Sequence, residues 1–469
     1  MKKNRSKLYI LSTHLLYAIV GIFILHPVSA QEYTTVGQEE QRPNIVIIMA
    51  DDLDSHELSA YGGTNINTKN IDLLAKEGLK FNHFIASEAM CVPTRASLFT
   101  GLYPAKHGSY QNHKPVNKDL KSVAHYLNDL GYRVGLTGKN HVTRPFPFEI
   151  IPGFEPNCVS ATDDYFLDSV ETFINDKEKP YCLFVMSINP HAPWTVGDPS
   201  EFDASKLTLP KHWVDTELTR QLFTKYLAEV RRLDDQVGDV LGLLERSGQA
   251  DNTIVIFLSE QGPQFPGGKW NLWDNGQKSG MLIRWPGRVN SGTETNAIAQ
   301  YEDITPTLID IAGGQPIENL DGKSFLDVIN GDIQQHRKFA FGIHNNIPEG
   351  PAYPIRSIRD KDYKLILNLS ADSNYYVRYM MNAKNENLAY TSWVEKAASD
   401  PQAKLLVERI ANRPHVEFYD LKLDPNELVN LANDPKYQNK IDEMRHELTK
   451  WMESQDDKGA AMDVPFGRK

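Results

Sequence analysis

The sequence predicts an α/β fold, with a mixed, mainly parallel sheet sandwiched by helices and a smaller C-terminal α+β subdomain. Four short runs, at 44–50, 132–138, 181–189 and 253–259, are almost continuously apolar, which is typical of strands buried on both faces. Segments with helical spacing alternate with these runs, as they do in parallel sheets. Beyond about residue 335 the pattern changes to short strands joined by tight polar turns.

The first half of the chain supplies the start of this sheet. The run NIVIIMA at 44–50 predicts a strand, and 71–81 has the apolar spacing of a helix. A further helix is expected at 119–131, because its apolar spacing ends at a glycine, a favoured helix terminator. The run YRVGLTG at 132–138 then predicts the second strand.

Two more strands flank the longest expected helix. The run YCLFVMSIN at 181–189 predicts the third strand, and TIVIFLS at 253–259 predicts the fourth. Between them, residues 216–247 carry one continuous amphipathic pattern. The alternation of strand and helix therefore continues across the first half of the chain.

The C-terminal part has a different texture. Residues 355–369 predict two strands joined by a polar turn at 359–362. Residues 417–432 predict a strand, a turn at 424–426 and the start of a helix, and 440–454 predict a closing amphipathic helix. We therefore expect a large domain at 43–335 and a subdomain with a small antiparallel sheet at 336–469.

The first thirty residues have the features of a signal peptide with cleavage after Ala30. A basic segment precedes an apolar run of about 18 residues, and small residues follow it. A membrane anchor is the alternative, because such a run just reaches across a bilayer; three polar residues at 12–14 interrupt it. We expect a periplasmic or secreted protein without stable membrane insertion after cleavage, and residues 31–42 form a lead-in.

Charge and cysteine content exclude several classes of protein. The formal charge is −11, and it falls to about −15 without the four leader cations. A chain this acidic has no general electrostatic attraction for nucleic acid. An anionic substrate would need a local basic pocket. Three cysteines are too few for a disulfide scaffold. Pairing of Cys158 with Cys182, which would leave Cys91 over, stays open.

Charged or polar side chains directly follow all four apolar runs. In open α/β sheets, ligands bind outside the carboxyl ends of the strands, so these groups converge if the strands are neighbours. Each one taken alone is also explained as a solvated loop residue. The four endings are Asp51-Asp52, Lys139, Pro190-His191 and Glu260-Gln261.

The acidic endings predict a site for a hard cation. The adjacent carboxylates of Asp51 and Asp52 repel each other unless a cation or hydrogen-bond donors offset them. Glu260 would add a carboxylate and Gln261 an amide oxygen. A set of oxygens without thiolates favours Ca²⁺, or Mg²⁺ as the alternative, over zinc. The basic endings and Arg95 suit an anion with three or more oxygens.

The stretch CVPTRASLFTG at 91–101 gives Cys91 a special context. A lone cysteine is otherwise explained as a small buried hydrophobe or as half of a disulfide. The pattern Cys-x-Pro-x-Arg followed by x₄-Thr-Gly resembles the signature of the sulfatase family. Further motifs along the chain resemble the family and occur in the family's order: NIVIIMADD, LTGKNH, NPHAPW, SEQGPQFPGGK, KWNLWDNG, YPIRS and IRSIRDKDYKLI. Sulfamidase-like (heparan N-sulfatase) enzymes are the group that the chain resembles most.

This resemblance implies an alkaline-phosphatase-like fold and a modified Cys91. A formylglycine-generating or anaerobic sulfatase-maturating enzyme would oxidise the cysteine to formylglycine (3-oxoalanine), whose hydrate attacks sulfur while bound to one divalent cation. The implied metal ligands are Asp51, Asp52, residue 91, Glu260 and Gln261. The implied catalytic residues are Cys91 as nucleophile, Arg95 and Lys139 to steady it, His141 as base, His191 as acid and Lys269 to contact the sulfate.

The chain departs from the family pattern at two places. Glu260-Gln261 stands where the family usually has Asp-Asn, so each side chain is one methylene longer. Thr94 replaces the usual serine of the cysteine tag. A second Asp-Asn-Gly at 274–276 follows no apolar strand, and we interpret it as a turn.

The expected function is hydrolysis of sulfate esters, or of N-sulfate, in a sulfated glycan. Heparan-type N-sulfoglucosamine and marine algal glycans such as ulvan are both open as substrates. The alternatives are a phosphodiester or phosphonate hydrolase on the same scaffold and an inactive glycan-binding homologue. Four further residues either overhang the pocket or are solvated loop groups: His344, Tyr353, Arg356 and Arg359.

Overall fold

The computed structural model describes residues 42–142, 144–157, 165–382 and 384–464. The predicted signal peptide with its cleavage after Ala30, the lead-in as far as residue 41, and Cys158 lie outside these residues. Export and a Cys158–Cys182 pair therefore stay predictions. None of the helices in the described part of the chain combines the length and the apolar character that crossing a bilayer requires.

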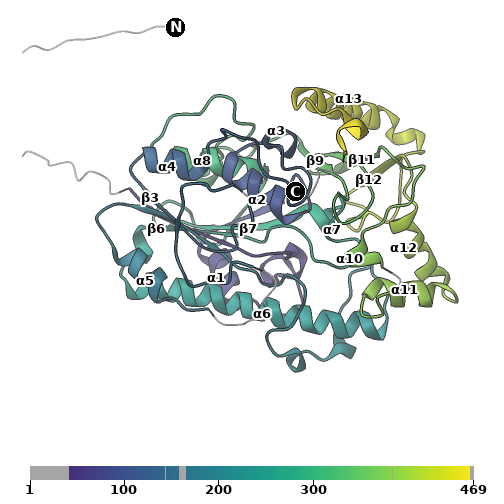
Figure 1. The fold of residues 1–469 in the computed structure, drawn as a ribbon, viewed down its shortest axis with the longest axis horizontal. Coiled ribbons are helices and arrows are strands. Elements are labelled where there is room, and N and C mark those ends of the chain that lie inside the picture. Colours follow the sequence, from purple (N-terminus) through teal and green to yellow (C-terminus); the bar gives the residue numbers. More distant parts are fainter. Residues whose placement is uncertain (1–41, 143, 158–164, 383, 465–469) are drawn as a thin grey trace, which may run out of the picture. The chain divides into compact units, whose positions relative to one another are not determined.

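An eight-stranded sheet forms the centre of the fold (Figure 1), with the strand order β4-β3-β5-β1-β6-β7-β2-β8. Neighbouring strands run parallel except at β7, which is antiparallel to β6 and to β2. The prediction of a mixed, mainly parallel sheet is therefore confirmed. Its strands are β1 (Asn44–Met49), β2 (Leu79–Ile85), β3 (Arg133–Gly138), β4 (Glu149–Ile150), β5 (Tyr181–Met186), β6 (Thr253–Leu258), β7 (Lys278–Arg284) and β8 (Thr293–Gln300).

The sequence prediction was wrong for part of 71–81. Only α1 (Lys69–Glu77) is helical, and the chain enters β2 directly after Gly78. A side chain at Gly78 would lie 2.2 Å from the carbonyl oxygen of Ile283, so the close approach of β7 requires glycine at this position. The strands β2, β4, β7 and β8 were not predicted from the sequence.

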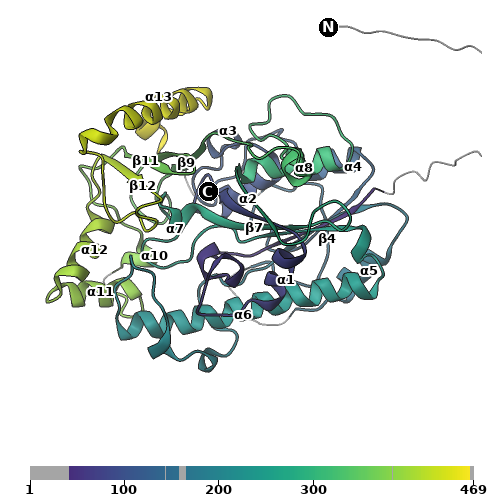
Figure 2. The same ribbon diagram turned by 180° about the vertical axis from the view of Figure 1, so that it is seen from behind.

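Helices cover both faces of the large sheet, as Figures 1 and 2 show from opposite sides. Alternate residues of β1 point to opposite faces. Val46 and Ile48 pack with α1, α5 and α6, whereas Ile45, Ile47 and Met49 pack with α2, α4, α8 and α9. These helices span Cys91–Thr100 (α2), Val123–Asp129 (α4), Asp168–Asn175 (α5), Glu217–Arg246 (α6), Ile304–Ile311 (α8) and Leu326–Ile329 (α9), and α3 spans Pro104–His107.

The C-terminal part forms a four-stranded antiparallel sheet in the order β12-β11-β10-β9. The helix α13 (Gln438–Ser454) packs on one face of it through Met444 and Leu448. The predicted strand pair and closing helix are thus present. The elements of this part are β9 (Ala340–His344), β10 (Ile355–Arg359), β11 (Tyr363–Asn368), α10 (Arg378–Met381), α11 (Ala389–Ala397), α12 (Pro401–Ala411) and β12 (Val416–Asp420).

The helix expected to start after the turn at 424–426 is absent from the described residues 427–432. Glu427 instead has a left-handed backbone, with φ of 53°, and its buried side chain accepts a hydrogen bond from the backbone N–H of Asp274 at 2.5 Å. A tertiary contact has therefore replaced the local helical turn.

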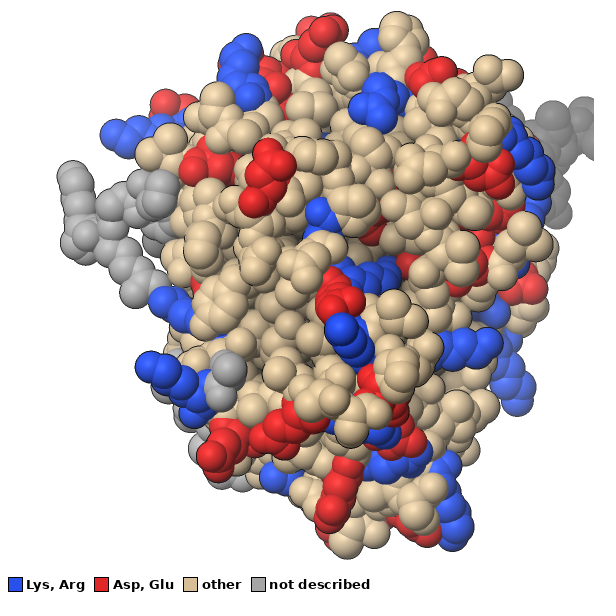
Figure 3. All heavy atoms as spheres, turned by 90° about the vertical axis from the view of Figure 1, so that its right-hand side faces the viewer, with Lys and Arg blue, Asp and Glu red and all other residues tan. Residues whose placement is uncertain are grey.

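The face on the right-hand side of Figure 1 is viewed directly in Figure 3. Acidic and basic side chains are interspersed on this face and form no broad field of one sign. Blue side chains are visible in a hollow near its centre.

Candidate active site

The four strands with polar endings lie next to one another in the sheet. They are β3, β5, β1 and β6, and each neighbouring pair is parallel. Their carboxyl ends therefore meet at one edge of the sheet, as ligand-binding α/β sheets require. This edge carries Lys139, His191, Asp51 with Asp52, and Glu260 with Gln261.

Asp51 and Asp52 lie at the centre of the polar cluster. The Lys139 ammonium forms an ion pair with Asp51 Oδ2, and an Arg95 guanidinium nitrogen lies 3.7 Å from Asp51 Oδ1. Asp52 Oδ2 accepts a hydrogen bond from Lys269 Nζ at 2.7 Å. Burial opposes ionisation of Asp51, but Lys139 and the neighbouring cations outweigh it and hold the pKa of Asp51 well below its usual range.

Glu260 pairs with Arg95 in this structure. Its Oε1 lies 2.7 Å from Arg95 Nε, and its Oε2 accepts the backbone N–H of Asp52 at 3.1 Å. Arg95 Nη1 also donates to the carbonyl oxygen of Lys139 at 2.6 Å. Arg95 therefore ties the signature helix α2 to the ends of β3 and β6.

The residues at this edge fit a bound divalent cation. Oxygens of Asp51 and Asp52 and a nitrogen of His191 lie within 4.8 Å of one another. Gln261 donates to Asp52 Oδ1 at 2.5 Å, and its own Oε1 is buried and accepts no hydrogen bond from the described residues. A buried oxygen of this kind suits a hard cation, and the surrounding oxygens are those that Ca²⁺ or Mg²⁺ prefers.

The charge of the site points in the same direction. Three carboxylates, those of Asp51, Asp52 and Glu260, face three basic side chains, those of Arg95, Lys139 and Lys269. These charges offset each other formally. A divalent cation would leave the site positive and therefore attractive to an anion.

Three residues at the strand ends have left-handed backbones. Asp52, His141 and Glu260 have φ of 64°, 57° and 71°. Residues other than glycine adopt this region only when the surrounding structure holds them there, and such positions are common at functional sites.

Cys91 is the first residue of α2 and lines the same space. Its side chain is almost fully buried, and burial raises the pKa of the thiol to about 11, although Lys139 and Lys269 act in the opposite direction. An unmodified thiol here is protonated at neutral pH and is a poor nucleophile. Thr94 donates to the carbonyl oxygen of Glu88 at 2.7 Å and so fastens the first turn of the helix.

The two histidines predicted to act as base and acid line the same cavity. His191 Nε2 lies 3.5 Å from Asp52 Oδ2, and Nδ1 donates to the carbonyl oxygen of Ala192 at 2.5 Å. Burial lowers the pKa of His191 to about 4, against the opposing effect of Asp52. Burial also lowers the pKa of His141, whose Nδ1 has no hydrogen-bond partner among the described residues.

The cavity that contains these groups has a volume of about 1010 Å³. Cys91, Lys139, His141, His191 and Lys269 all line it. Aromatic side chains form part of the wall, and Trp270 stacks on Tyr379 with ring centroids 6.4 Å apart. Flat aromatic walls of this kind suit the faces of sugar rings.

Several lining residues were missed from the sequence. Asn112 and His113 lie in the loop between α3 and α4, Glu349 lies between β9 and β10, and Arg378 and Tyr379 open α10. None of them follows a strand or belongs to a recognised motif, so no signal in the sequence marked them. The C-terminal part of the chain therefore supplies one wall of the cavity.

Both interpretations of the four further residues were wrong. His344, Tyr353, Arg356 and Arg359 are all buried, and none of them lines the cavity. Arg356 forms an ion pair with Asp457, and Arg359 pairs with Asp274 at 2.6 Å. They stabilise the C-terminal sheet and its contacts instead.

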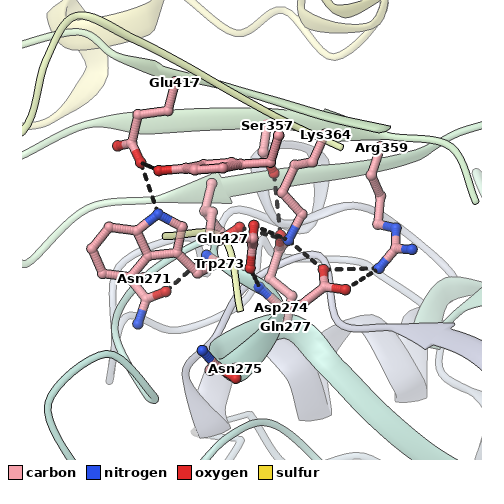
Figure 4. Close-up of polar contacts among 12 residues, drawn as sticks. Asn271, Trp273, Asp274, Asn275, Gln277, Ser357, Arg359, Lys364, Glu417 and Glu427 are labelled. Atoms are coloured by element: carbon pink, nitrogen blue, oxygen red, sulfur yellow. Dashed lines mark hydrogen bonds and ion pairs between the residues drawn. The ribbon is translucent and has the colours of Figure 1, made fainter. Parts of the chain in front are cut away.

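The segment that carries Lys269 is anchored to that sheet (Figure 4). The predicted turn at 274–276 is part of a buried one-turn helix, α7 (Asp274–Gln277). Asp274 forms ion pairs with Arg359 of β10 and Lys364 of β11, and Trp273 Nε1 donates to Glu417 of β12 at 2.8 Å. Burial opposes ionisation of Asp274, but these two cations keep its pKa well below the usual range.

Comparison with known proteins agrees with this geometry. Residues 43–314 match the sulfatase family, and residues 268–390 match the family described as N-sulphoglucosamine sulphohydrolase, C-terminal. The second match covers both the Lys269 segment and the C-terminal wall of the cavity. The resemblance found in the sequence is therefore confirmed at the level of the family.

Two curated relatives cover most of this chain. An ulvan-active sulfatase of Formosa agariphila is 31% identical over 426 residues, which is 89% of this chain and 81% of that protein. The N-sulphoglucosamine sulphohydrolase of Homo sapiens is 27% identical over 467 residues, which is 87% of this chain and 89% of that protein.

A solved structure supports the fold. The structure of BT4656 in complex with its substrate D-glucosamine-2-N,6-O-disulfate has a TM-score of 0.71 and 21% identity to this chain, and the match covers 90% of this chain and 100% of that chain. The family pattern extends over more than half of the sequence, and the Formosa relative passes 30% identity over nearly all of it. The chain therefore belongs to the sulfatase family and is a sulfuric ester hydrolase.

Proposed function

We propose that this protein is an exported sulfatase that removes sulfate groups from a sulfated polysaccharide or its oligosaccharides, with residue 91 as the nucleophile. The observation that carries the proposal is that four parallel strand ends meet at one edge of the sheet, beside a cavity lined by Cys91. Export rests on the predicted leader.

We propose that Cys91 acts as formylglycine, formed by a separate maturation enzyme that reads the Cys-x-Pro-x-Arg tag. The buried, protonated thiol supports this, because it would be a weak nucleophile in its unmodified form. The aldehyde hydrate supplies the hydroxyl that attacks sulfur. A bound cation, for which we propose Ca²⁺ with Mg²⁺ as the alternative, would draw electron density from that hydroxyl and from the sulfate oxygens.

Asp51, Asp52, residue 91, Glu260 and Gln261 are the proposed cation ligands. The buried Gln261 Oε1 and the clustered oxygens of Asp51 and Asp52 support this ligand set, because they already lie at one edge of the sheet. Glu260 would have to share its carboxylate with Arg95, which it contacts in this structure.

The remaining site residues have complementary roles in the proposed reaction. Lys139, Lys269 and Arg95 neutralise negative charge that develops on the sulfate and on the nucleophile. His191 donates a proton to the leaving sugar oxygen, or nitrogen for an N-sulfate, and Asp52 stabilises its protonated form. His141 accepts the proton that must leave the nucleophile's remaining hydroxyl before sulfate is released.

The substrate class is proposed from the cavity and from the relatives. The aromatic wall suits a sugar ring, and the C-terminal match includes that wall. The relatives named above are an ulvan-active sulfatase and an N-sulphoglucosamine sulphohydrolase. We therefore propose ulvan-type and N-sulfoglucosamine glycans as the first substrates to test.

Two measurements test this function. Mass spectrometry of the tryptic peptide that contains residue 91 should show formylglycine in protein made in its native host. Purified protein should release sulfate from one or more defined ulvan or heparan oligosaccharides, and Cys91→Ala should release none. An unmodified thiol in active protein, or full activity in Cys91→Ala, would contradict the proposal. Assays with phosphodiester and phosphonate substrates, run in parallel, test the alternative function.

A further inference from the structure

Asn112 and Glu349 form a polar pair on the wall of the catalytic cavity. Both line the cavity, yet they are only 4% and 2% exposed. Asn112 Nδ2 donates to Glu349 Oε1 at 2.7 Å. Backbone hydrogen bonds hold both residues in place, from Asn112 N to Ile347 O at 3.2 Å and from Arg378 N to Glu349 O at 3.0 Å.

This pair leaves two buried acceptors without a partner. Glu349 Oε2 and Asn112 Oδ1 accept no hydrogen bond from the described residues. The Asn112 amide must turn its NH₂ group toward the carboxylate, so its oxygen remains for another donor. Buried acceptors are normally satisfied in a folded protein, and a ligand donor is a natural partner where they line a cavity.

The pair lies close to the proposed reaction centre. Glu349 Oε1 is 3.6 Å from His113 Nε2, and the His113 ring is 5.2 Å from the His141 ring by centroids. His141 lies two residues after Lys139, which pairs with Asp51. A sugar whose sulfate reaches Cys91 would therefore bring its own ring substituents toward Asn112 and Glu349.

We infer that Asn112 and Glu349 form a specificity-determining subsite that accepts hydrogen bonds from a hydroxyl or amino group on the sugar that carries the scissile sulfate. The inference rests on the proposed function and deepens it. A carboxylate at this wall repels a second sulfate or a uronate at the same place, whereas Lys139 and Lys269, which oppose the effect of burial on the pKa of Cys91, line the cavity near that residue. The preferred substrate thus carries an unsulfated donor group beside the scissile sulfate.

Glu349→Gln tests this inference because it keeps the shape and removes the charge. For ulvan and heparan oligosaccharides that release sulfate, kcat/KM should fall by about 10- to 100-fold, as expected when a hydrogen bond to a charged group is lost. The kcat/KM for 4-nitrophenyl sulfate, which has no sugar hydroxyl, should fall by much less than the kcat/KM for the oligosaccharides. The ratio of kcat/KM for singly sulfated to doubly sulfated oligosaccharides should also decrease.

Glu57→Gln is the matched control, because Glu57 is a buried carboxylate outside the cavity lining. Glu57→Gln should leave kcat/KM unchanged both for the oligosaccharides and for 4-nitrophenyl sulfate. The Tm of each variant shows whether it folds. Calorimetric binding of the same oligosaccharides to Cys91→Ser protein, with and without Glu349→Gln, gives a readout that needs no turnover. Equal Kd values in the two proteins, or equal losses on 4-nitrophenyl sulfate and on sugars, would overturn the inference. If the parent enzyme turned over none of these substrates but still bound the oligosaccharides in a way that depends on Glu349, the proposed function alone would be contradicted.

Discussion

At the residue scale, the candidate metal centre depends on buried oxygens that the fold brings together. Gln261 shows this clearly, since its amide nitrogen donates to Asp52 while its buried oxygen has no donor among the described residues. The longer Glu260-Gln261 pair in place of Asp-Asn keeps an oxygen at each position. Glu260 Oε1 lies 2.7 Å from Arg95 Nε.

Calcium binding should therefore stabilise the protein through Gln261. We expect Ca²⁺ at about 100 times its Kd to stabilise the wild-type fold by roughly 2.7 kcal/mol, with a rise in Tm, and EGTA to reverse this. Gln261→Leu should lose most of the rise, because it removes a ligand oxygen without adding charge. Differential scanning fluorimetry with and without Ca²⁺ measures the effect.

Gln264→Leu is the control for this experiment. Gln264 lines the same cavity, but it is half-buried and lies outside the proposed ligand set. Its calcium-induced rise in Tm should equal that of the wild type. An undiminished rise in Gln261→Leu would remove Gln261 from the ligand set.

His107 predicts a pH dependence of stability that is separate from the reaction. It is fully buried, its Nδ1 accepts the backbone N–H of Ser109 at 3.1 Å, and its Nε2 lies 3.3 Å from Ser97 Oγ on α2. Burial lowers the pKa of His107 to about 3. The unfolded chain, with a histidine pKa near 6.5, therefore binds a proton below that pH that the folded protein does not bind.

Stability from this residue is complete above pH 6.5 and is lost progressively between pH 6.5 and about 3. The expected slope is up to about 1.4 kcal/mol per pH unit. In His107→Gln the free energy of unfolding, from urea titrations across this range, should fall less steeply than in the wild type. His446→Gln, at an exposed histidine of α13, should keep the wild-type slope; if the slope of His107→Gln is also unchanged, the assignment is wrong.

At the scale of elements, the Lys269 segment is positioned by the C-terminal sheet. Asp274 in α7 pairs with Arg359 and Lys364, and Trp273 lies under Arg409, whose guanidinium is 3.7 Å from the ring centroid (Figure 4 shows all of these except Arg409). Tyr375 also donates to the carbonyl oxygen of Trp270 at 2.5 Å. A change in this network should therefore reach the catalytic cavity.

Asp274→Asn tests this coupling. It leaves two buried cations with weakened partners, so we expect a loss of about 3 kcal/mol in the free energy of unfolding. We also expect kcat/KM to fall about tenfold, because Lys269 is held less firmly. Urea unfolding and steady-state kinetics measure the two effects.

The control for this variant is Glu443→Gln on α13. Glu443 pairs with Lys338 and Lys440 near the surface, at 3.0 and 3.1 Å. Pairs of this kind contribute up to about 1 kcal/mol, so its stability and kinetics should be close to those of the wild type. Wild-type kinetics in Asp274→Asn would show that the network does not position Lys269.

At the scale of the whole molecule, the two sheets are joined by buried contacts, although the sequence suggested two regions divided near residue 335. Arg337 binds Asp303, and its backbone N–H forms a bridge to Ile298 of β8. Gln300 donates to Phe341 O at 2.9 Å and accepts its N–H at 3.1 Å. The C-terminal sheet also completes the cavity wall.

We therefore expect residues 42–464 to unfold in a single cooperative transition. A chain that ends at residue 335 would lose the partners of Asp274, Gln300 and Asp303 and should not fold on its own. Calorimetry of the full chain, and expression of the 1–335 fragment with circular dichroism of any soluble product, check this. A fragment with its own cooperative melting transition would contradict it.

The sequence predicted best where a local pattern carries the information. The runs that became β1, β3, β5 and β6 are buried on both faces and therefore continuously apolar, and α6 matches its expected 216–247 closely, with Thr216 as its N-cap. β8 and the short β4 lack such a run. β2 was not predicted because the helical spacing of α1 continues into its first residues. Where local spacing competes with a tertiary contact, as at Gly78 or Glu427, the sequence alone misleads.

The same distinction holds for the site. Motifs at strand ends and at the start of α2 determined which residues would meet, because parallel strands share one edge and the Cys-x-Pro-x-Arg stretch is a local signature. Only the tertiary structure decided what surrounds them. Asn112, Glu349 and Arg378 come from segments far apart in the chain that follow no periodic pattern, and they form a wall only because the C-terminal sheet packs against the strand ends. Chemistry that depends on neighbours along the chain can be predicted from sequence, whereas substrate contacts made between distant loops require the folded structure.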